Sequence, residues 1–122
     1  MKTSSAKNKG RILQQYICKF LTELFVWGEG DAESRSMGSA GIDVMLSPEA
    51  RADFPFSIES KNTKSFPSLA ALNQAVYNVK TGTLPGVVWK PPGKGMNQSI
   101  IYFSFEEFSM FWKKENNDKT NK

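Results

Sequence analysis

The sequence predicts one domain of the α/β (α+β) class, in which helices flank a single mixed β-sheet. Apolar residues recur at spacings of three and four in some stretches, and short β-branched or aromatic runs lie between those stretches. The expected order is helix, three strands, helix, two strands, helix. A length of 122 residues is that of one domain, 1–122, whose polar ends, about residues 1–9 and 115–122, are expected to be solvated tails.

The first helix is predicted from about Gly10 to Trp27, where the apolar residues follow helical spacing. At 100° per residue, Gln14 falls at the margin of the apolar face. We therefore expect Gln14 to be buried, either as a hydrogen-bonded structural amide or as a polar group at a site. Cys18, also at this margin, is expected to be a small buried residue.

Three strands are expected to follow. Each alternates between two faces, so Asp43 lies opposite the apolar side of the second strand, and Glu59 and Lys61 share one face of the third. Residues 49–55 are expected to be a polar connection between these strands. The predicted strands span residues 32–37, 41–46 and 56–61.

The second half of the chain repeats this alternation of helix and strand. A helix over residues 67–80 begins at Pro67 and ends before Gly82. Two strands and a short final helix complete the domain. Their ranges are 85–90, 99–105 and 105–112. We expect the large aromatic side chains of this half to lie in the core, namely Trp89, Phe103, Phe111 and Trp112.

Composition excludes several classes of function. The chain has no histidine and a single cysteine, Cys18, so it cannot form a His/Cys zinc site, a Ser-His-Asp triad or an internal disulfide framework. It has neither a long apolar run nor an apolar segment after its basic N-terminus, and we expect an intracellular protein without a signal peptide or membrane span. Sixteen Lys and Arg against twelve Asp and Glu give a charge of +4, which favours phosphate-bearing partners.

Three ionisable residues, Asp43, Glu59 and Lys61, lie on strands that are otherwise apolar. Two carboxylates on adjacent strands repel each other, and a hard cation such as Mg²⁺ would compensate them. A lysine beside the ion could then orient an attacking water or stabilise a phosphate transition state. The alternative is a surface hairpin held by salt bridges, and spacing alone leaves both interpretations open.

Three segments carry a family resemblance. The strand GIDV at residues 41–44 and the strand FSIESK at residues 56–61, which follow a helix opened by Lys9 and Gly10, resemble the PD-(D/E)XK nuclease superfamily. The segment RSMGSAG at residues 35–41 makes the chain most similar to archaeal-type Holliday-junction resolvases and to small nucleases encoded by bacteriophages. The similarity covers roughly residues 9–110.

This resemblance implies a restriction-endonuclease-like core and a Mg²⁺-dependent endodeoxyribonuclease, with Mn²⁺ able to substitute. It implies that Asp43, Glu59 and the backbone carbonyl of Ser60 hold the metal and that Lys61 positions the water. Ile42 stands where the family has proline, which leaves the aspartate intact. Gln14 stands where the resolvases have a glutamate; it can orient a water but brings no charge, so the number of metal ions stays open.

The resemblance also implies the partners. They are DNA, with preference for branched DNA as in recombination, and a second copy of the chain as a homodimer; no membrane and no small-molecule cofactor is expected. The alternatives are a nickase, flap or restriction-type nuclease, or a DNA-binding module that keeps the nuclease fold without catalysis. Expected DNA contacts are Arg35, Ser36, Ser39, Lys64, Gln74 and Lys94, with Lys90 as a further candidate.

Overall fold

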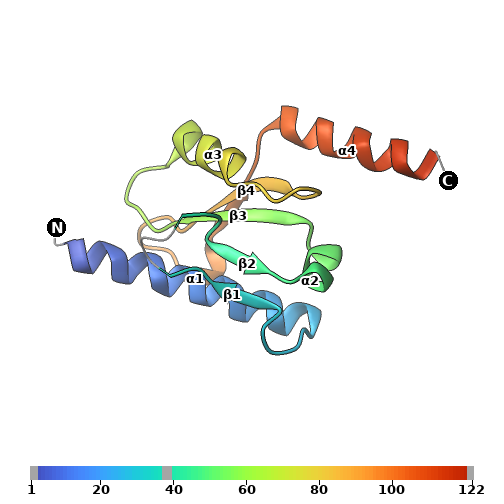
Figure 1. Ribbon diagram of the computed structural model, residues 1–122. Helices are drawn as coiled ribbons and strands as arrows, with labels where there is room; N and C mark the ends of the chain where they lie inside the picture. Colours follow the sequence, from blue (N-terminus) through green and yellow to red (C-terminus); the bar gives the residue numbers. More distant parts are fainter. Residues whose placement is uncertain (1–2, 37–39, 121–122) are drawn as a thin grey trace.

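The protein is an α+β domain, seen in a computed structural model that describes residues 3–36 and 40–120, with side chains described from 5 to 116 within those ranges. Figure 1 shows the elements in order. They are α1 (Thr3–Phe25), β1 (Ala32–Ser34), β2 (Val44–Leu46), α2 (Pro48–Asp53), β3 (Phe56–Lys61), α3 (Ser68–Tyr77), β4 (Leu84–Trp89), the 3-10 helix η1 (Met96–Gln98), β5 (Ile100–Tyr102) and α4 (Phe105–Thr120). No described helix is both long and apolar enough to cross a membrane.

The predicted order of helices and strands is confirmed with two additions, the 3-10 helix η1 before β5 and the helix α2, which takes the place of the expected polar connection. The hydroxyl of Ser47 accepts a hydrogen bond from the amide of Ala50 at 3.1 Å, and Pro48 occupies the first turn. A serine cap followed by proline is a helix start signal, because both satisfy or remove amides that have no helical partner. The signal was therefore present in the sequence but was outweighed by the short, polar character of the segment.

The ends of the chain also differ from the prediction. Residues 5–9 are exposed, as expected of a tail, but they belong to α1, and α4 continues through the predicted C-terminal tail as far as Thr120. Lysine, alanine and glutamate favour helix, and a polar composition alone does not distinguish an exposed helix from a tail. In α1, Arg11 donates to the side chain of Asn8 one turn earlier, which adds a local contact.

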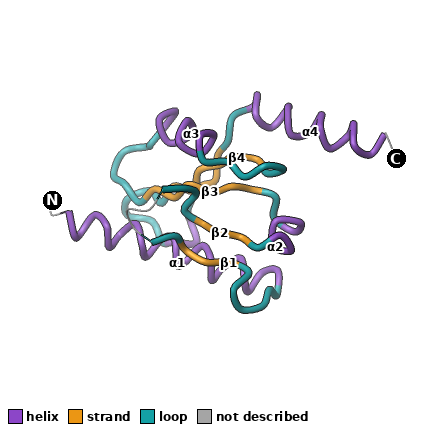
Figure 2. Tube along the Cα trace, in the orientation of Figure 1, coloured by secondary structure: helices purple, strands orange, loops and turns teal. Residues whose placement is uncertain are grey.

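The strands form two sheets, which corrects the prediction of a single mixed sheet. β1 and β2 pair in antiparallel fashion, with Ala32 opposite Leu46. The second sheet has the order β3-β4-β5, with β3 and β4 parallel and β4 and β5 antiparallel. β2 lies beside β3 in Figure 2, but no ladder of hydrogen bonds joins them. The mixed character of the larger sheet is confirmed.

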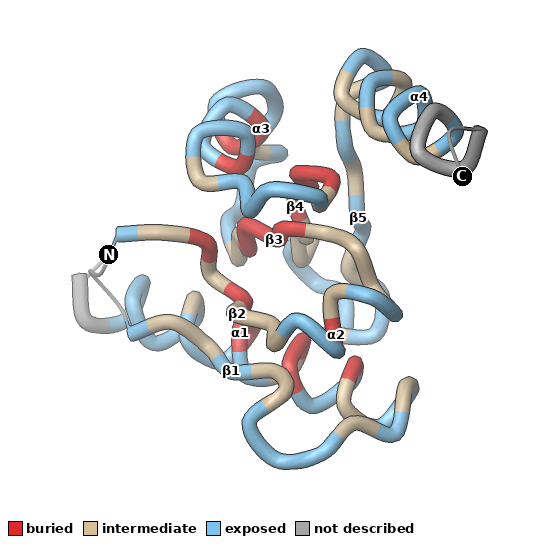
Figure 3. Tube along the Cα trace, turned by 45° about the vertical axis from the view of Figure 1, so that its right-hand side comes forward, coloured by how far each residue is buried: buried red, intermediate tan, exposed pale blue. Residues whose placement is uncertain are grey.

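Helices cover both faces of the three-stranded sheet (Figure 1). On one face, α1 packs Leu13 and Ile17 against Val44 and Ile58. On the other, Ala71, Leu72 and Ala75 of α3 pack on Val87. Figure 3 shows that the buried residues concentrate on β3, β4 and the facing sides of these two helices. The small alanines let α3 approach the sheet closely, so the residues of β3 that face α3 are enclosed.

Cys18 lies on the buried side of α1, as predicted, with an exposed fraction of 8%. Burial raises the pKa of its thiol to about 11, and the charge of Glu33 acts in the same direction. Because the thiolate is the reactive form, this cysteine is chemically quiet at neutral pH.

The expectation that the aromatic residues of the second half lie in the core is wrong for Trp112 and Phe103, which are 53% and 38% exposed. α4 leaves the sheet after its first turns (Figure 1), so its aromatic face has little sheet to pack on. Phe108 joins the two residues in a row of stacked rings, with centroids 5.9 and 6.5 Å apart. Trp89 and Phe111 are half-buried.

Candidate active site

The side chains of β3 that face α3 are all polar. The Ser57 hydroxyl lies 2.6 Å from that of Thr83, and Glu59 accepts a hydrogen bond from the Asn78 side chain at 3.4 Å. Lys61 donates from Nζ to Oε1 of Gln74 on α3 at 3.1 Å. Strand alternation puts this polar row on one face, and the last turn of α3 with the segment after it provides partners along the row.

Asp43, the residue just before β2, reaches this row. Its Oδ2 accepts a hydrogen bond from the backbone amide of Ser60 at 2.8 Å, and the Ser60 hydroxyl lies 3.3 Å away. The carbonyls of Pro55 and Lys61 point toward β4, where each accepts a hydrogen bond from a backbone amide at 2.9 Å. Because successive residues of a strand direct their backbone groups to opposite sides, the even-numbered residues of β3, which include Ser60, direct theirs toward β2. The Asp43 carboxylate therefore takes the position of a missing ladder partner, and it brings its charge next to Glu59.

Glu59 is 1% exposed. Burial raises its pKa to about 7, and Asp43 adds to the rise through its charge and a hydrogen bond, whereas Asn78 and Lys61 lower it. A buried carboxyl beside a second carboxylate holds its proton near neutral pH unless a cation compensates the charge. The pair is therefore costly as a structural feature and well suited to bind a cation.

The oxygen donors around this pair fit Mg²⁺. They are the carboxylates of Asp43 and Glu59 and the carbonyl of Ser60, which points to the same edge as its amide. Within the described residues, no third Asp, Glu, His or Cys joins them to form a metal-binding group. Mg²⁺ is commonly held by one or two carboxylates together with waters and substrate phosphates, so two carboxylates suffice.

Gln14 is buried, as predicted, with 4% of its surface exposed. Among the residues that the structure describes, its Oε1 has no hydrogen-bond partner. The Asn62 side chain donates to the carbonyl of Lys9 at 3.1 Å, and Phe25 contacts Phe54, so α1 runs antiparallel to β3. Gln14 lies five residues after Lys9, which is about 7.5 Å along the helix, and about two residues of strand cover the same length. Counting back two residues from Asn62 therefore places Gln14 near the level of Ser60. An unpartnered buried oxygen there favours the site interpretation over a satisfied structural amide.

The structure brings together Asp43, Glu59, Lys61 and Gln74. Arg35 donates from Nε to the carbonyl of Ile42 at 2.7 Å, next to Asp43. Lys64 and Lys94 are exposed on the loops that follow β3 and β4, and Lys90 donates to the carbonyl of Pro91. Ser36 is exposed, and Ser39 lies outside the described residues.

Gly41 allows Arg35 to fold over the turn before Asp43. Gly41 has a φ of +115°, and a Cβ there would lie 2.6 Å from the central carbon of the guanidinium. Glycine is therefore needed for both the backbone and the contact.

Sequence reasoning missed Asn78, which contacts Glu59. It stands at the C-terminal cap of α3, a position where asparagine is common. The cap could have been predicted from the sequence, but its proximity to β3 depends on how α3 packs.

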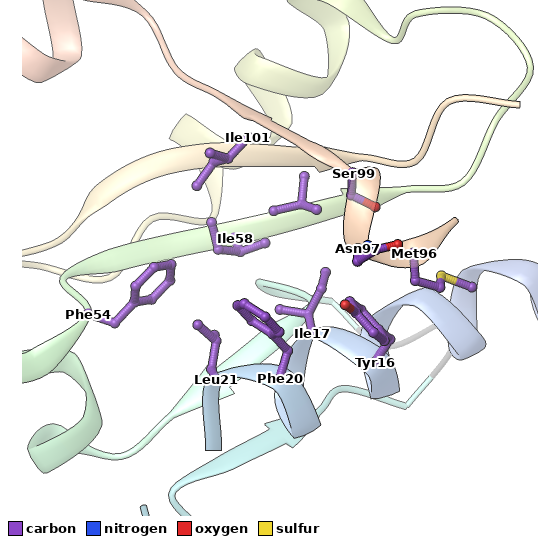
Figure 4. Close-up of a pocket in the computed structure, with 11 residues that line it drawn as sticks. Tyr16, Ile17, Phe20, Leu21, Phe54, Ile58, Met96, Asn97, Ser99 and Ile101 are labelled. Carbon is purple, nitrogen blue, oxygen red and sulfur yellow. The ribbon is translucent and has the colours of Figure 1, made fainter. Parts of the chain in front are cut away.

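An apolar cavity of about 230 Å³ lies on the opposite face of β3, between α1 and the sheet. Figure 4 shows Tyr16, Ile17 and Phe20 of α1 facing Ile58 and Ile101 across it. No residue that lines the cavity carries a carboxylate, thiol or amine, so the ionisable groups that could carry acid-base chemistry lie on the α3 face and not in this cavity.

Comparison with known proteins adds no relative: no family model matches the sequence, and no curated protein or solved structure matches the chain.

Proposed function

We propose that this protein is a metal-dependent DNA endonuclease of the PD-(D/E)XK type, built on a restriction-endonuclease-like core. One observation carries the proposal: Asp43 is hydrogen-bonded to the Ser60 amide at 2.8 Å, beside the buried Glu59, while Lys61 emerges on the same face of β3. Two carboxylates and an amine in this arrangement are the components of metal-assisted phosphodiester hydrolysis.

Asp43, Glu59 and the Ser60 carbonyl would hold Mg²⁺ or Mn²⁺. When bound, such an ion acts as a Lewis acid on the phosphate and lowers the pKa of water. The protein's contribution is to fix these oxygens in advance: the Ser60 amide orients Asp43, and Asn78 orients Glu59.

Lys61 would orient the attacking water and stabilise negative charge on the phosphate. Its ammonium is held by Gln74 on one side and keeps two further N–H donors for water or substrate. Gln14 lies on α1, which packs on the other face of β3, but near the level of Ser60, and its unpartnered Oε1 can accept a hydrogen bond from a water there. In this proposal, Lys61 and Gln14 act on water, whereas Gln74 acts by positioning Lys61.

We propose branched DNA as the substrate and a homodimer as the active form. The charge of +4 and the exposed Lys64 and Lys94 near the carboxyl ends of β3 and β4 supply phosphate contacts. Symmetric cutting of a four-way junction needs two sites related by a two-fold axis, which a homodimer supplies. A DNA-binding module without catalysis is the second candidate, favoured by the uncharged Gln14 on α1.

The experiment compares a four-way DNA junction, a matched linear duplex and a single strand, each with Mg²⁺ or EDTA. We expect the junction to be cut with Mg²⁺ only, and Glu59→Gln to lower the rate by about 10³-fold or more, since it removes a charged metal ligand. Tight junction binding without cleavage in Mg²⁺ or Mn²⁺ would support the binding module instead. Cleavage unchanged by EDTA or by the substitution would contradict the proposed site.

A further inference from the structure

The gap between β2 and β3 contains a second polar feature, separate from the carboxylates. The backbone carbonyl of Asp43 accepts a hydrogen bond from the backbone amide of Arg35 at 2.9 Å, and the amide of Ser47 donates to the carbonyl of Asp31 at 2.9 Å. The backbone groups of Asp43 and Ser47 therefore point toward β1. The carbonyls of Ile42 and Leu46 must therefore face β3. No strand amide meets these two carbonyls; both are capped by arginine side chains.

The capping arginines are Arg35 and Arg51. Nε of Arg35 donates to Ile42 at 2.7 Å, and Nη1 of Arg51 donates to Leu46 at 2.5 Å. A guanidinium has five N–H donors, so each arginine keeps several for another acceptor. Both arginines are thus fixed by the backbone while most of their hydrogen-bonding capacity is unused.

These arginines line a pocket of about 120 Å³ together with Lys80 and Ser57. We call Arg35, Arg51 and Lys80 the cationic pocket. Its lining contains no carboxylate, and in the part of the chain that the structure describes, none of the three cations forms an ion pair. The volume is that of about four waters. Three unpaired like charges around a small space repel one another, and an anion in that space would relieve the repulsion.

The cationic pocket adjoins the proposed active site. Ser57 precedes Glu59 by two residues on the same face of β3, which corresponds to about 7 Å. Ile42 and Val44, which flank Asp43, also line the pocket. An anion held there would lie next to a phosphate bound at the carboxylates.

We propose that the cationic pocket binds one backbone phosphate of the DNA, beside the phosphate that is cut. The choice of DNA rests on the proposed function, but binding of a phosphate group follows from the pocket itself. Guanidinium groups form paired hydrogen bonds with phosphate oxygens, and Lys80 adds a mobile charge. The pocket would fix the register of the strand on the active site.

The first test uses inorganic phosphate against chloride at equal ionic strength. We expect phosphate to raise the melting temperature of the wild type and of Lys113→Gln, a matched charge change on α4, but not that of Lys80→Gln. Arg51→Lys serves as a second variant of the pocket. Lysine is chosen over glutamine because Arg51→Gln removes the charge together with the hydrogen bond to the Leu46 carbonyl, and that loss alone could destabilise the fold. An equal phosphate effect in all variants would overturn the proposal.

The second test measures binding of a labelled DNA duplex in EDTA across a range of salt concentrations. We expect Lys80→Gln to weaken binding three- to tenfold and to reduce the slope of log affinity against log salt by about one, with little change for Lys113→Gln. Phosphate stabilisation without any effect of Lys80→Gln on DNA binding would indicate a site for free phosphate and overturn the backbone assignment. Because this assay needs no cleavage, failure of the nuclease proposal and failure of the cationic pocket remain distinguishable.

Discussion

The two faces of β3 differ sharply although they belong to the same six residues. The α3 face carries Ser57, Glu59 and Lys61, each hydrogen-bonded to a polar partner. The α1 face carries Phe56 and Ile58 in apolar packing and has a polar residue, Ser60, only at its end next to Asp43. Both faces are largely buried, so burial alone does not separate structure from function. The difference teaches that the apolar face supplies stability, whereas the polar face encloses ionisable groups at a cost in stability, which is the cost expected of the proposed metal site.

Lys61→Ala should produce the largest effect, on the polar face. We expect cleavage of the junction to fall by about 10³-fold, or about 4 kcal/mol in activation free energy, because a charge at the phosphate is lost. The melting temperature should change little, since Lys61 is only half-buried and has one neutral partner. Single-turnover cleavage is the measurement, with Lys64→Ala as the control; similar losses in both variants would remove the special role of Lys61.

Ile58→Ala tests the apolar face. We expect the free energy of unfolding to fall by about 3 kcal/mol, because Ile58 is 1% exposed and its truncation enlarges the cavity beside α1. Urea denaturation measures the loss, and cleavage below the melting transition should stay within a few-fold of wild type. If cleavage were lost while stability was kept, the division between the two faces would be wrong.

The pH dependence of stability should report Glu59. Its pKa is raised from 4.5 to about 7 in the folded state, so the folded protein binds the extra proton between these values and stability falls as pH rises through that window. The difference between the two pKa values corresponds to at most about 3 kcal/mol. Urea denaturation in EDTA from pH 4.5 to 8 should show this decline in wild type but not in Glu59→Gln. Equal profiles would mean that Glu59 is not the group responsible.

Gln74→Leu should have the smallest effect. Loss of one exposed hydrogen bond to Lys61, worth about 1 kcal/mol, should reduce cleavage about fivefold without changing the midpoint of unfolding. The neighbouring exposed residue Asn73 offers a control, as Asn73→Leu changes the same kind of surface without touching Lys61. A rise in KM with an unchanged kcat would instead favour direct contact of Gln74 with DNA.

The sequence predicted most of the elements and the faces of the strands, because the periodicity of apolar residues reports which side of an element is buried. The alternation in residues 56–61 placed Glu59 and Lys61 together, and helical spacing placed Gln14 on the buried margin. Periodicity says nothing about strand edges. The split between β2 and β3 therefore could not be predicted, since it depends on Asp43 and two arginines capping backbone groups across a gap.

The cationic pocket shows the same limit. Arg35 was predicted to contact DNA from a motif, but Arg51 lies on the unpredicted helix α2 and Lys80 follows α3. Only the packing of α2 and α3 against the two sheets brings these charges to one place. Trp112 illustrates the opposite error: its aromatic character suggested a core, yet the direction taken by α4 leaves half of its surface in solvent.

The state of Cys18 has a practical consequence for studies of assembly. As the single cysteine, buried on α1 with a thiol pKa of about 11, it resists oxidation and labelling by thiol reagents. A cysteine introduced on the exposed surface, for instance by Lys113→Cys, would then be the one thiol that reacts in the folded protein. A spin label or fluorophore at that position would test the proposed homodimer, through the distance between two copies on a junction, without removal of the native residue.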